Sequence, residues 1–306
     1  VQTRAMSHEQ NVLRSSWRGG VPCEVRLHAG DVASVTGPEP IFLMLKRNSY
    51  LPVALKPALE VFAEFVLETP AEASELWFET EMVTAKEDRP QMTALALNWH
   101  IPSGVLYDLV NSSAADERAS GAHQRPWRII VHFQGLPSSE VPRCTPAAMR
   151  SFFFNAVKQA LYIESGSVQR WFGLPVAKQD QLYEGLVAGD VDVFLSPHAS
   201  IATPLEELKQ IPVRVLGCSG ALSSGTSGPN EPGVALQSFV QLALPPKLSV
   251  GALIELVRSR CGGDFEDAKA VVNGVAVEDD WRLLETWKTL QCPDHFLYFL
   301  IRNKVG

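Results

Sequence analysis

One order of predicted secondary structure occurs twice in this chain, and a helical stretch separates the two copies. The order is strand, strand, helix, strands, short helix and a final strand. The first copy covers about residues 23–136 and the second about 211–306; Pro126 or Pro293 precedes the final strand of each. This repetition predicts a three-part molecule in which two similar units flank a helical one.

The first copy has clear strand and helix signals. Strands are predicted at 23–29 and 41–45, followed by a helix at about 53–67 that tolerates Pro57 only near its first turn. The remaining elements are predicted at 75–81, 95–100, 103–111 and 127–133. Two polar stretches, 82–95 and 114–124, are expected to be solvated loops because charged residues and proline do not suit a sheet interior.

The second copy repeats these signals. Strands are predicted at 213–216 and 236–244, with a flexible Gly/Ser-rich loop at 217–233 between them. Ser249 is expected to cap a helix, and Asn273-Gly274 between valine-rich runs predicts a two-residue hairpin. A helix at 281–290 and a strand at 296–302 follow. Residues 296–301 are all apolar, so we expect one face of that strand to cover its own helix and the other to be buried against the rest of the chain.

This order of elements is that of the β-grasp fold of ubiquitin-like domains, where the last strand lies mid-sheet beside the first. The predicted fold class is α+β: two ubiquitin-like β-grasp domains flank a helix-rich domain, and a short N-terminal helix precedes them. The expected parts are 1–22 for the N-terminal helix and leading segment, 23–136 for the first ubiquitin-like domain, 137–210 for the helix-rich domain and connector, and 211–306 for the second ubiquitin-like domain.

The helix-rich part contains one strongly marked helix, predicted at 145–162. Thr145 can cap it and Pro146 suits its first position, where the missing N–H costs nothing. A second helix is expected at 178–187, and Ser196, Pro197, Thr203 and Pro204 are expected to mark a connector. In the first helix the apolar stripe faces one way and Lys158 the other, which is the ordinary pattern of a solvated lysine.

Composition excludes several functions. A net charge of -7 without a concentrated Lys/Arg block argues against nucleic-acid binding. No apolar run approaches a membrane span and the first residues lack an apolar signal core, so we expect a cytoplasmic protein. The five cysteines are odd in number and widely spaced without a CxxC, which favours reduced thiols.

Catalytic motifs are absent from the sequence. It contains no P-loop, GxGxxG, HExxH or GxSxG. His100 and His132 lie in apolar stretches, which favours satisfied structural imidazoles over ligands. Neither a cofactor nor a metal site is therefore predicted, and no catalytic residue. Two alternatives stay open: a hydrolase or transferase using Cys261 or a loop serine, and a ubiquitin-like adaptor that is never modified.

Four motifs in order resemble the autophagy-related protein 5 family across nearly the whole chain. The first is Val12-Leu13-Arg14 with Trp17 and Gly19, and the most distinctive runs from Leu97 to Pro102, LNWHIP. The others are Pro126-Trp127 with the strand after it, and the segment Pro293-Asp294-His295-Phe296-Leu297. The longer 82–95 and 114–124 stretches depart from the family's pattern, and the first of them puts the register of the neighbouring hairpin in doubt.

The resemblance implies a non-catalytic acceptor and scaffold. By position, Lys158 would accept the C-terminal glycine of the ubiquitin-like autophagy-related protein 12. The conjugate would bind the coiled-coil autophagy-related protein 16 and promote transfer of autophagy-related protein 8 to phosphatidylethanolamine on preautophagosomal membranes, with only peripheral membrane association. A partner surface is expected near the junction of the three parts, at Trp17, Gly19, Phe154 and Tyr162; the two aromatic rings nearest Lys158 are also expected to desolvate its amine in part.

Overall fold

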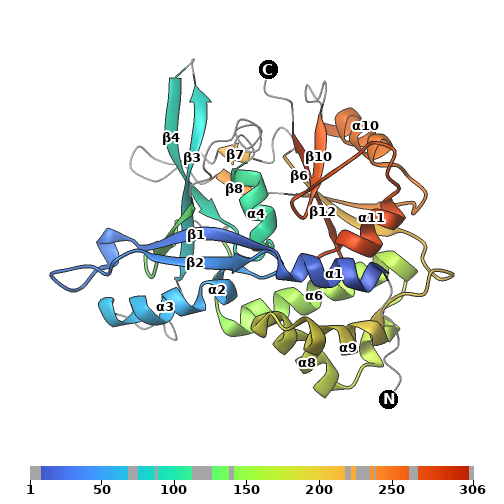
Figure 1. The fold of residues 1–306 in the computed structure, drawn as a ribbon, viewed down its shortest axis with the longest axis horizontal. Coiled ribbons are helices and arrows are strands. Elements are labelled where there is room, and N and C mark those ends of the chain that lie inside the picture. The colour runs from blue at the N-terminus through green and yellow to red at the C-terminus, as the bar shows by residue number, and fades with distance from the viewer. Residues whose placement is uncertain are drawn as a thin grey trace.

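The computed structural model describes residues 8–67, 75–86, 89–111, 126–137, 141–217, 222–224, 235–237, 239–261 and 268–302. Two five-stranded sheets flank a group of helices, as the sequence predicts. Figure 1 shows the first sheet at the left, the second at the upper right, and the helices below and to the right. No described helix is long and apolar enough to cross a membrane.

The first sheet has the predicted topology. Its strands are β1 (Gly20–Leu27), β2 (Ile41–Lys46), β3 (Trp77–Lys86), β4 (Arg89–Leu97) and β5 (Trp127–His132), in the order β2-β1-β5-β3-β4. The final strand β5 lies parallel to β1 in mid-sheet. Helices α2 (Leu51–Ala54), α3 (Lys56–Phe62) and α4 (Ser103–Val110) accompany it, with the short 3₁₀ turns η1 (Ala29–Asp31) and η2 (Ala63–Phe65).

The second sheet repeats that topology. Its strands are β6 (Ile211–Leu216), β9 (Val240–Leu244), β10 (Lys269–Val272), β11 (Val275–Val277) and β12 (Leu297–Arg302), in the order β11-β10-β12-β6-β9, and its helices are α10 (Val250–Cys261) and α11 (Leu283–Leu290). Ser249 Oγ accepts from the Ala252 N–H at 3.2 Å, so the predicted cap is confirmed. Asn273 and Gly274 both have positive φ, 49° and 81°, as the predicted two-residue hairpin requires.

Strand β12 joins the two cores. Phe296, Tyr298 and Leu300 lie in the same core as the interior of the first sheet. The alternate residues Leu297, Phe299 and Ile301 pack with α10 and α11 in the core of the second. Because successive side chains of a strand point to opposite faces, one apolar strand serves both cores, which confirms the expected burial of both faces.

The helical part consists of α6 (Pro146–Ser165), α7 (Gln169–Phe172), α8 (Val176–Ala188) and α9 (Val191–Ile201); the N-terminal helix α1 (His8–Arg18) lies beside α11. The prediction that Ser196 and Pro197 mark a connector is wrong, because both lie within α9. Pro197 has no backbone N–H, so it cannot donate the helical hydrogen bond to the carbonyl four residues earlier, which is that of Val193. The Gln181 side chain donates to this carbonyl at 3.3 Å instead, so a contact from α8 satisfies the freed acceptor.

The stretch 82–95 is not the predicted loop. It forms the outer part of a long β3–β4 hairpin in which Lys86 pairs with Arg89, and the hairpin extends beyond the rest of the sheet in Figure 1. Strand β4 lies at the edge of the sheet. Pro90 is tolerated there because proline lacks an N–H, and no further described strand pairs with the outer side of β4 in this sheet.

Two further predictions need adjustment, and two others fall on residues outside the described ranges. The predicted helix at 53–67 is divided into α2, α3 and η2, and Pro57 occupies the first turn of α3. The strand predicted at 236–244 is divided into β8 (Ala235–Gln237), which pairs with β7 (Leu222–Ser224), and β9. The stretch 114–124 and most of 217–233 lie outside the described residues.

Candidate conjugation site

Helix α6 has well-defined ends that fix its position. Thr145 Oγ1 accepts from the Ala148 N–H at 3.1 Å, and Pro146 occupies the first turn. At the other end Gly166 adopts a left-handed conformation with φ 78°, and its N–H donates to the Tyr162 carbonyl. These are the predicted start and a glycine C-cap. The buried side consists of Phe153, Ala156, Val157, Ala160, Leu161 and Glu164.

Lys158 lies on the other side of this helix and is half-buried. Within the described part of the chain, its Nζ makes no hydrogen bond or ion pair. The residues directly before and after it, Val157 and Gln159, are buried and exposed respectively. The amine is therefore uncommitted, as an acceptor amine must be.

Lys178 on α8 offers a useful comparison. Its Nζ donates to Gln181 Oε1 at 3.1 Å and to Ser196 Oγ at 3.4 Å. An amine held by two acceptors must lose them before it can attack a carbonyl carbon, and this costs free energy. Of these two lysines of the helical part, Lys158 is the one available for reaction.

The other four predicted partner residues have different environments. Phe154 is half-buried and its ring lies 4.8 Å from that of Trp171, so it belongs to an aromatic cluster with α7 and α8. Tyr162 is 62% exposed and available to a partner. Trp17 is buried, with its ring 4.7 Å from that of Phe194, and attaches α1 to the helical part. Gly19 is half-buried directly after this helix.

A buried polar network holds α6 against the second sheet, and sequence reasoning missed it. Glu164 is fully buried; its carboxylate accepts from Thr203 Oγ1 at 2.6 Å and lies 3.1 Å from His295 Nδ1. Its backbone carbonyl accepts from the Lys209 N–H at 2.6 Å. The sequence contained one signal for this network: Glu164 lies one turn after Ala160, in the apolar stripe of the helix.

A second buried network lies at the same junction. Arg214 on β6 donates to Tyr298 Oη at 2.6 Å and to Asp294 Oδ2 at 3.2 Å, and its guanidinium carbon lies 3.7 Å from the Phe296 ring centroid. Burial, together with the negative charge of Asp294, raises the pKa of Tyr298 well above its usual value, although the Arg214 charge opposes this. A charged residue inside an apolar strand was the sequence signal for this network.

Comparison with known proteins identifies the family. Residues 16–133 match the model for the UblA domain of autophagy protein ATG5, and residues 146–204 match the model for its alpha-helical bundle region. Together these matches span more than half of the chain. The chain belongs to the autophagy protein ATG5 family.

Curated relatives agree over most of the sequence. Autophagy protein 5 from Oryza sativa subsp. indica is 29% identical over 255 residues, which are 83% of this chain and 60% of that protein. The chain thus spans about 60% of the length of this rice relative. Autophagy protein 5 from Aspergillus oryzae is 25% identical, and that match covers 95% of this chain and 97% of the relative.

A solved structure of the family supports the fold. The crystal structure of Kluyveromyces marxianus Atg5 matches with a TM-score of 0.71 at 17% sequence identity, covering 96% of this chain and 100% of that one. At this identity the match concerns the fold alone. It confirms the predicted α+β class, in which two ubiquitin-like sheets flank a helical bundle.

Proposed function

We propose that this autophagy protein is joined through Lys158 to the C-terminal glycine of the ubiquitin-like autophagy-related protein 12. The observation that supports this best is the uncommitted Nζ of Lys158 on a helix fixed at both ends. The conjugate then binds the coiled-coil autophagy-related protein 16 and acts as an E3-like scaffold. It promotes transfer of autophagy-related protein 8 to phosphatidylethanolamine.

The chemical step requires a neutral amine. The lone pair of Lys158 Nζ attacks the carbonyl carbon of the modifier's terminal glycine, which a conjugating enzyme holds as a thioester. The C–N bond forms, the C–S bond breaks, the enzyme's cysteine leaves as thiolate, and the amine gives up a proton to solvent. The chain supplies the nucleophile and its position, and the conjugating enzyme supplies the activated carbonyl; the scaffold itself is non-catalytic.

The fixed geometry of α6 supports this role. The capped first turn and the Glu164 contacts hold the helix at both ends, so that Lys158 projects from a rigid element. A conjugating enzyme that docks on this surface meets the amine in one place, which reduces the entropic cost of the reaction. Arg150 pairs with Asp180 nearby and links α6 to α8.

We also propose that the coiled-coil partner binds where α1 meets the helical part. Tyr162 on α6 is exposed and offers contact surface, while Trp17 attaches α1 to α9 and Phe154 attaches α6 to α7 and α8. In this proposal the chain acts in the cytoplasm and reaches preautophagosomal membranes through its complex.

The test is reconstituted conjugation with the modifier, its activating and conjugating enzymes and ATP. We expect the wild-type chain to give a covalent, thiol-resistant upshift, with an isopeptide at Lys158 identified by mass spectrometry. Lys158→Arg keeps the charge and most of the stem but lacks the acceptor amine, so the upshift should disappear. Lys178→Arg is the matched control and should conjugate normally.

Binding of the coiled-coil partner separates the remaining alternatives. Lys158→Arg should still bind autophagy-related protein 16, because the substitution leaves the proposed binding surface unchanged. An upshift that persists in Lys158→Arg and is lost in Lys178→Arg would move the acceptor to α8. Partner binding without any conjugate in the wild-type chain would favour an unmodified adaptor.

A further inference from the structure

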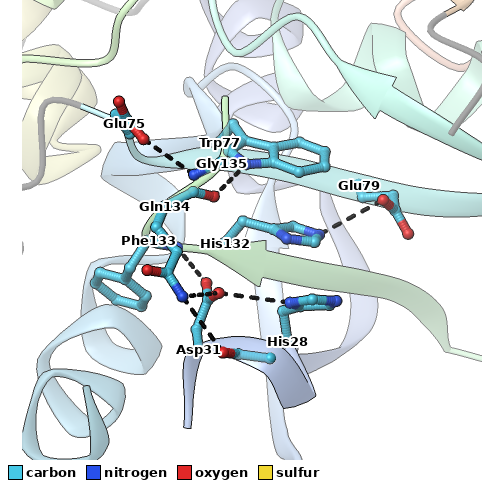
Figure 2. Close-up of polar contacts among 10 residues, drawn as sticks. His28, Asp31, Glu75, Trp77, Glu79, His132, Phe133, Gln134 and Gly135 are labelled. Atoms are coloured by element: carbon cyan, nitrogen blue, oxygen red, sulfur yellow. Dashed lines mark hydrogen bonds and ion pairs between the residues drawn. The ribbon is translucent and has the colours of Figure 1, made fainter. Parts of the chain in front are cut away.

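Three strands of the first sheet bring two histidines and two carboxylates together, away from α6. His28 follows β1, His132 ends β5 and Glu79 lies on β3, while Asp31 ends the turn η1. The parallel pairing of Leu27 with Val131 places the two histidines side by side at the ends of their strands. Figure 2 shows their rings one above the other, with Asp31 beside His28 and Glu79 beside His132.

Asp31 is fixed in one orientation. It is buried, and its Oδ2 accepts from the Phe133 backbone N–H at 2.6 Å. Its Oδ1 lies 3.5 Å from His28 Nδ1 and accepts from Gln134 Nε2 at 3.1 Å. One carboxylate oxygen is therefore anchored by the main chain, and the other faces the imidazole.

His132 is fixed as well. It is buried, and its ring stacks on Trp77 with centroids 3.7 Å apart and an interplanar angle of 14°. Trp77 is held in turn by a hydrogen bond from its Nε1 to the Gln134 carbonyl at 3.0 Å. His132 Nε2 makes no hydrogen bond to the described residues, although Glu79 Oε2 lies 3.5 Å away.

The cluster opens into a cavity of about 730 Å³. Its lining includes all four of these residues, together with Glu75, Trp77 and the 134–137 segment. His28 is the least enclosed member, with 45% of its side chain exposed, whereas the side chain of Asp31 is 4% exposed. Fixed groups thus form one wall, and the half-exposed imidazole of His28 stands at the opening.

We propose that His28, Asp31 and His132 bind a Zn²⁺ ion. The three residues offer ligand atoms within 4.8 Å of one another. Two imidazoles and one carboxylate suit zinc, whereas Ca²⁺ and Mg²⁺ prefer oxygen ligands alone. The cavity leaves room for a water molecule as the fourth ligand. The sequence predicted a structural role for His132 because this residue lies in an apolar stretch; its partners here come from distant parts of the chain.

The neighbouring groups match the outer ligand shell of a zinc site. Because His132 Nε2 faces Glu79, we assign Nδ1 to the ion and Nε2–H to that carboxylate. A zinc-bound histidine usually donates its other N–H to a carboxylate in this way, which orients the ring. The Phe133 N–H plays the corresponding role for Asp31.

Binding requires a small movement of His28. Its ring now stacks on His132, with centroids 4.2 Å apart and an interplanar angle of 28°, so the in-plane lone pairs of the two rings do not converge. Zinc–ligand bonds of about 2 Å bring two donor atoms within about 4 Å of each other. The half-exposed His28 can tilt to achieve this while Asp31 and His132 stay in place.

The experiment uses the full chain without a histidine tag, treated with a chelator and then titrated with Zn²⁺ by calorimetry. Substitution by Co²⁺ reports tetrahedral coordination through its visible absorption. We expect one ion per chain, no binding of Mg²⁺ or Ca²⁺, and at least about 100-fold weaker Zn²⁺ binding in His28→Ala and Asp31→Asn. Glu79→Gln, which removes only the outer carboxylate, should weaken binding about 10- to 100-fold.

Glu75→Gln is the matched control, because Glu75 lines the same cavity but accepts from the Gly135 N–H instead of contacting the histidines. This variant should bind zinc as the wild-type chain does. His28 is half-exposed, so His28→Ala should fold normally, which circular dichroism would verify. The proposal fails if the wild-type chain binds no zinc, if His28→Ala binds it equally well, or if Glu75→Gln loses it to the same extent.

Discussion

Removing the Glu164 side chain should destabilise the junction between the helical part and the second sheet. In the wild-type chain its carboxylate satisfies both Thr203 Oγ1 and His295 Nδ1, all within buried residues. Glu164→Ala leaves both groups without this partner and opens a cavity between α6 and the residues before β12. The main-chain bond from Lys209 to the Glu164 carbonyl does not depend on the side chain.

The expected cost follows from the two lost contacts. A buried polar group that loses its hydrogen-bond partner costs about 1–3 kcal/mol, and Glu164→Ala leaves two such groups, Thr203 Oγ1 and His295 Nδ1. We therefore expect Glu164→Ala to lower the free energy of unfolding by about 3–5 kcal/mol. Glu164→Gln keeps an acceptor for Thr203 and should cost about half as much.

Urea unfolding followed by tryptophan fluorescence and circular dichroism measures this difference. Glu184→Ala is the matched control, because Glu184 is exposed on α8 and its loss should change stability by less than about 0.5 kcal/mol. In a double-mutant cycle, Glu164→Ala and His295→Ala should be coupled by about 0.5–3 kcal/mol. If Glu164→Ala costs no more than Glu184→Ala, the network contributes nothing to stability and the reasoning is refuted.

Two further predictions concern buried ionisable groups. Burial, and to a smaller extent the nearby Arg214 charge, lowers the pKa of His100 from 6.5 to about 4. As the pH falls, the imidazole of His100 is therefore protonated in the unfolded chain before it is protonated in the folded one. The free energy of unfolding is at its full value above pH 6.5 and decreases towards pH 4. Between pH 7 and 5 we expect the free energy of unfolding, measured with urea, to fall by on the order of 1–2 kcal/mol in the wild-type chain and by less in His100→Gln. An equal fall in both proteins would contradict this. Burial also raises the pKa of Cys23 and Cys144 to about 12, so a thiol reagent should leave both unlabelled in the native protein and titrate five thiols after denaturation; recovery of three or fewer would show disulfides.

Local sequence determined most of the elements. The Thr145-Pro146 start and the Asn273-Gly274 turn are confirmed because their structural preferences reside in the residues themselves. The apolar run of β12 likewise predicted its burial on both faces, since alternation along a strand is a local property. The repeated order of elements then limited the topology to two β-grasp sheets.

Where local preference conflicted with a distant contact, only the tertiary structure decided the outcome. Pro197 argued against a helix, but the side chain of Gln181 satisfies the carbonyl that the proline leaves unpaired. The charges in 82–95 argued against strands, but the stretch forms the outer part of a hairpin whose second strand, β4, lies at the edge of the sheet.

The same distinction separates Lys158 from the other candidate groups. Its place on the outer side of α6 followed from helical periodicity, whereas its lack of partners among the described residues became known only with the surrounding elements in place. The networks around Glu164 and His132 include contacts between residues more than 50 positions apart in sequence, such as Glu79 with His132 and Glu164 with His295. Periodicity and capping report on the nearest few residues, so contacts at that separation are set by how the sheets and helices pack together.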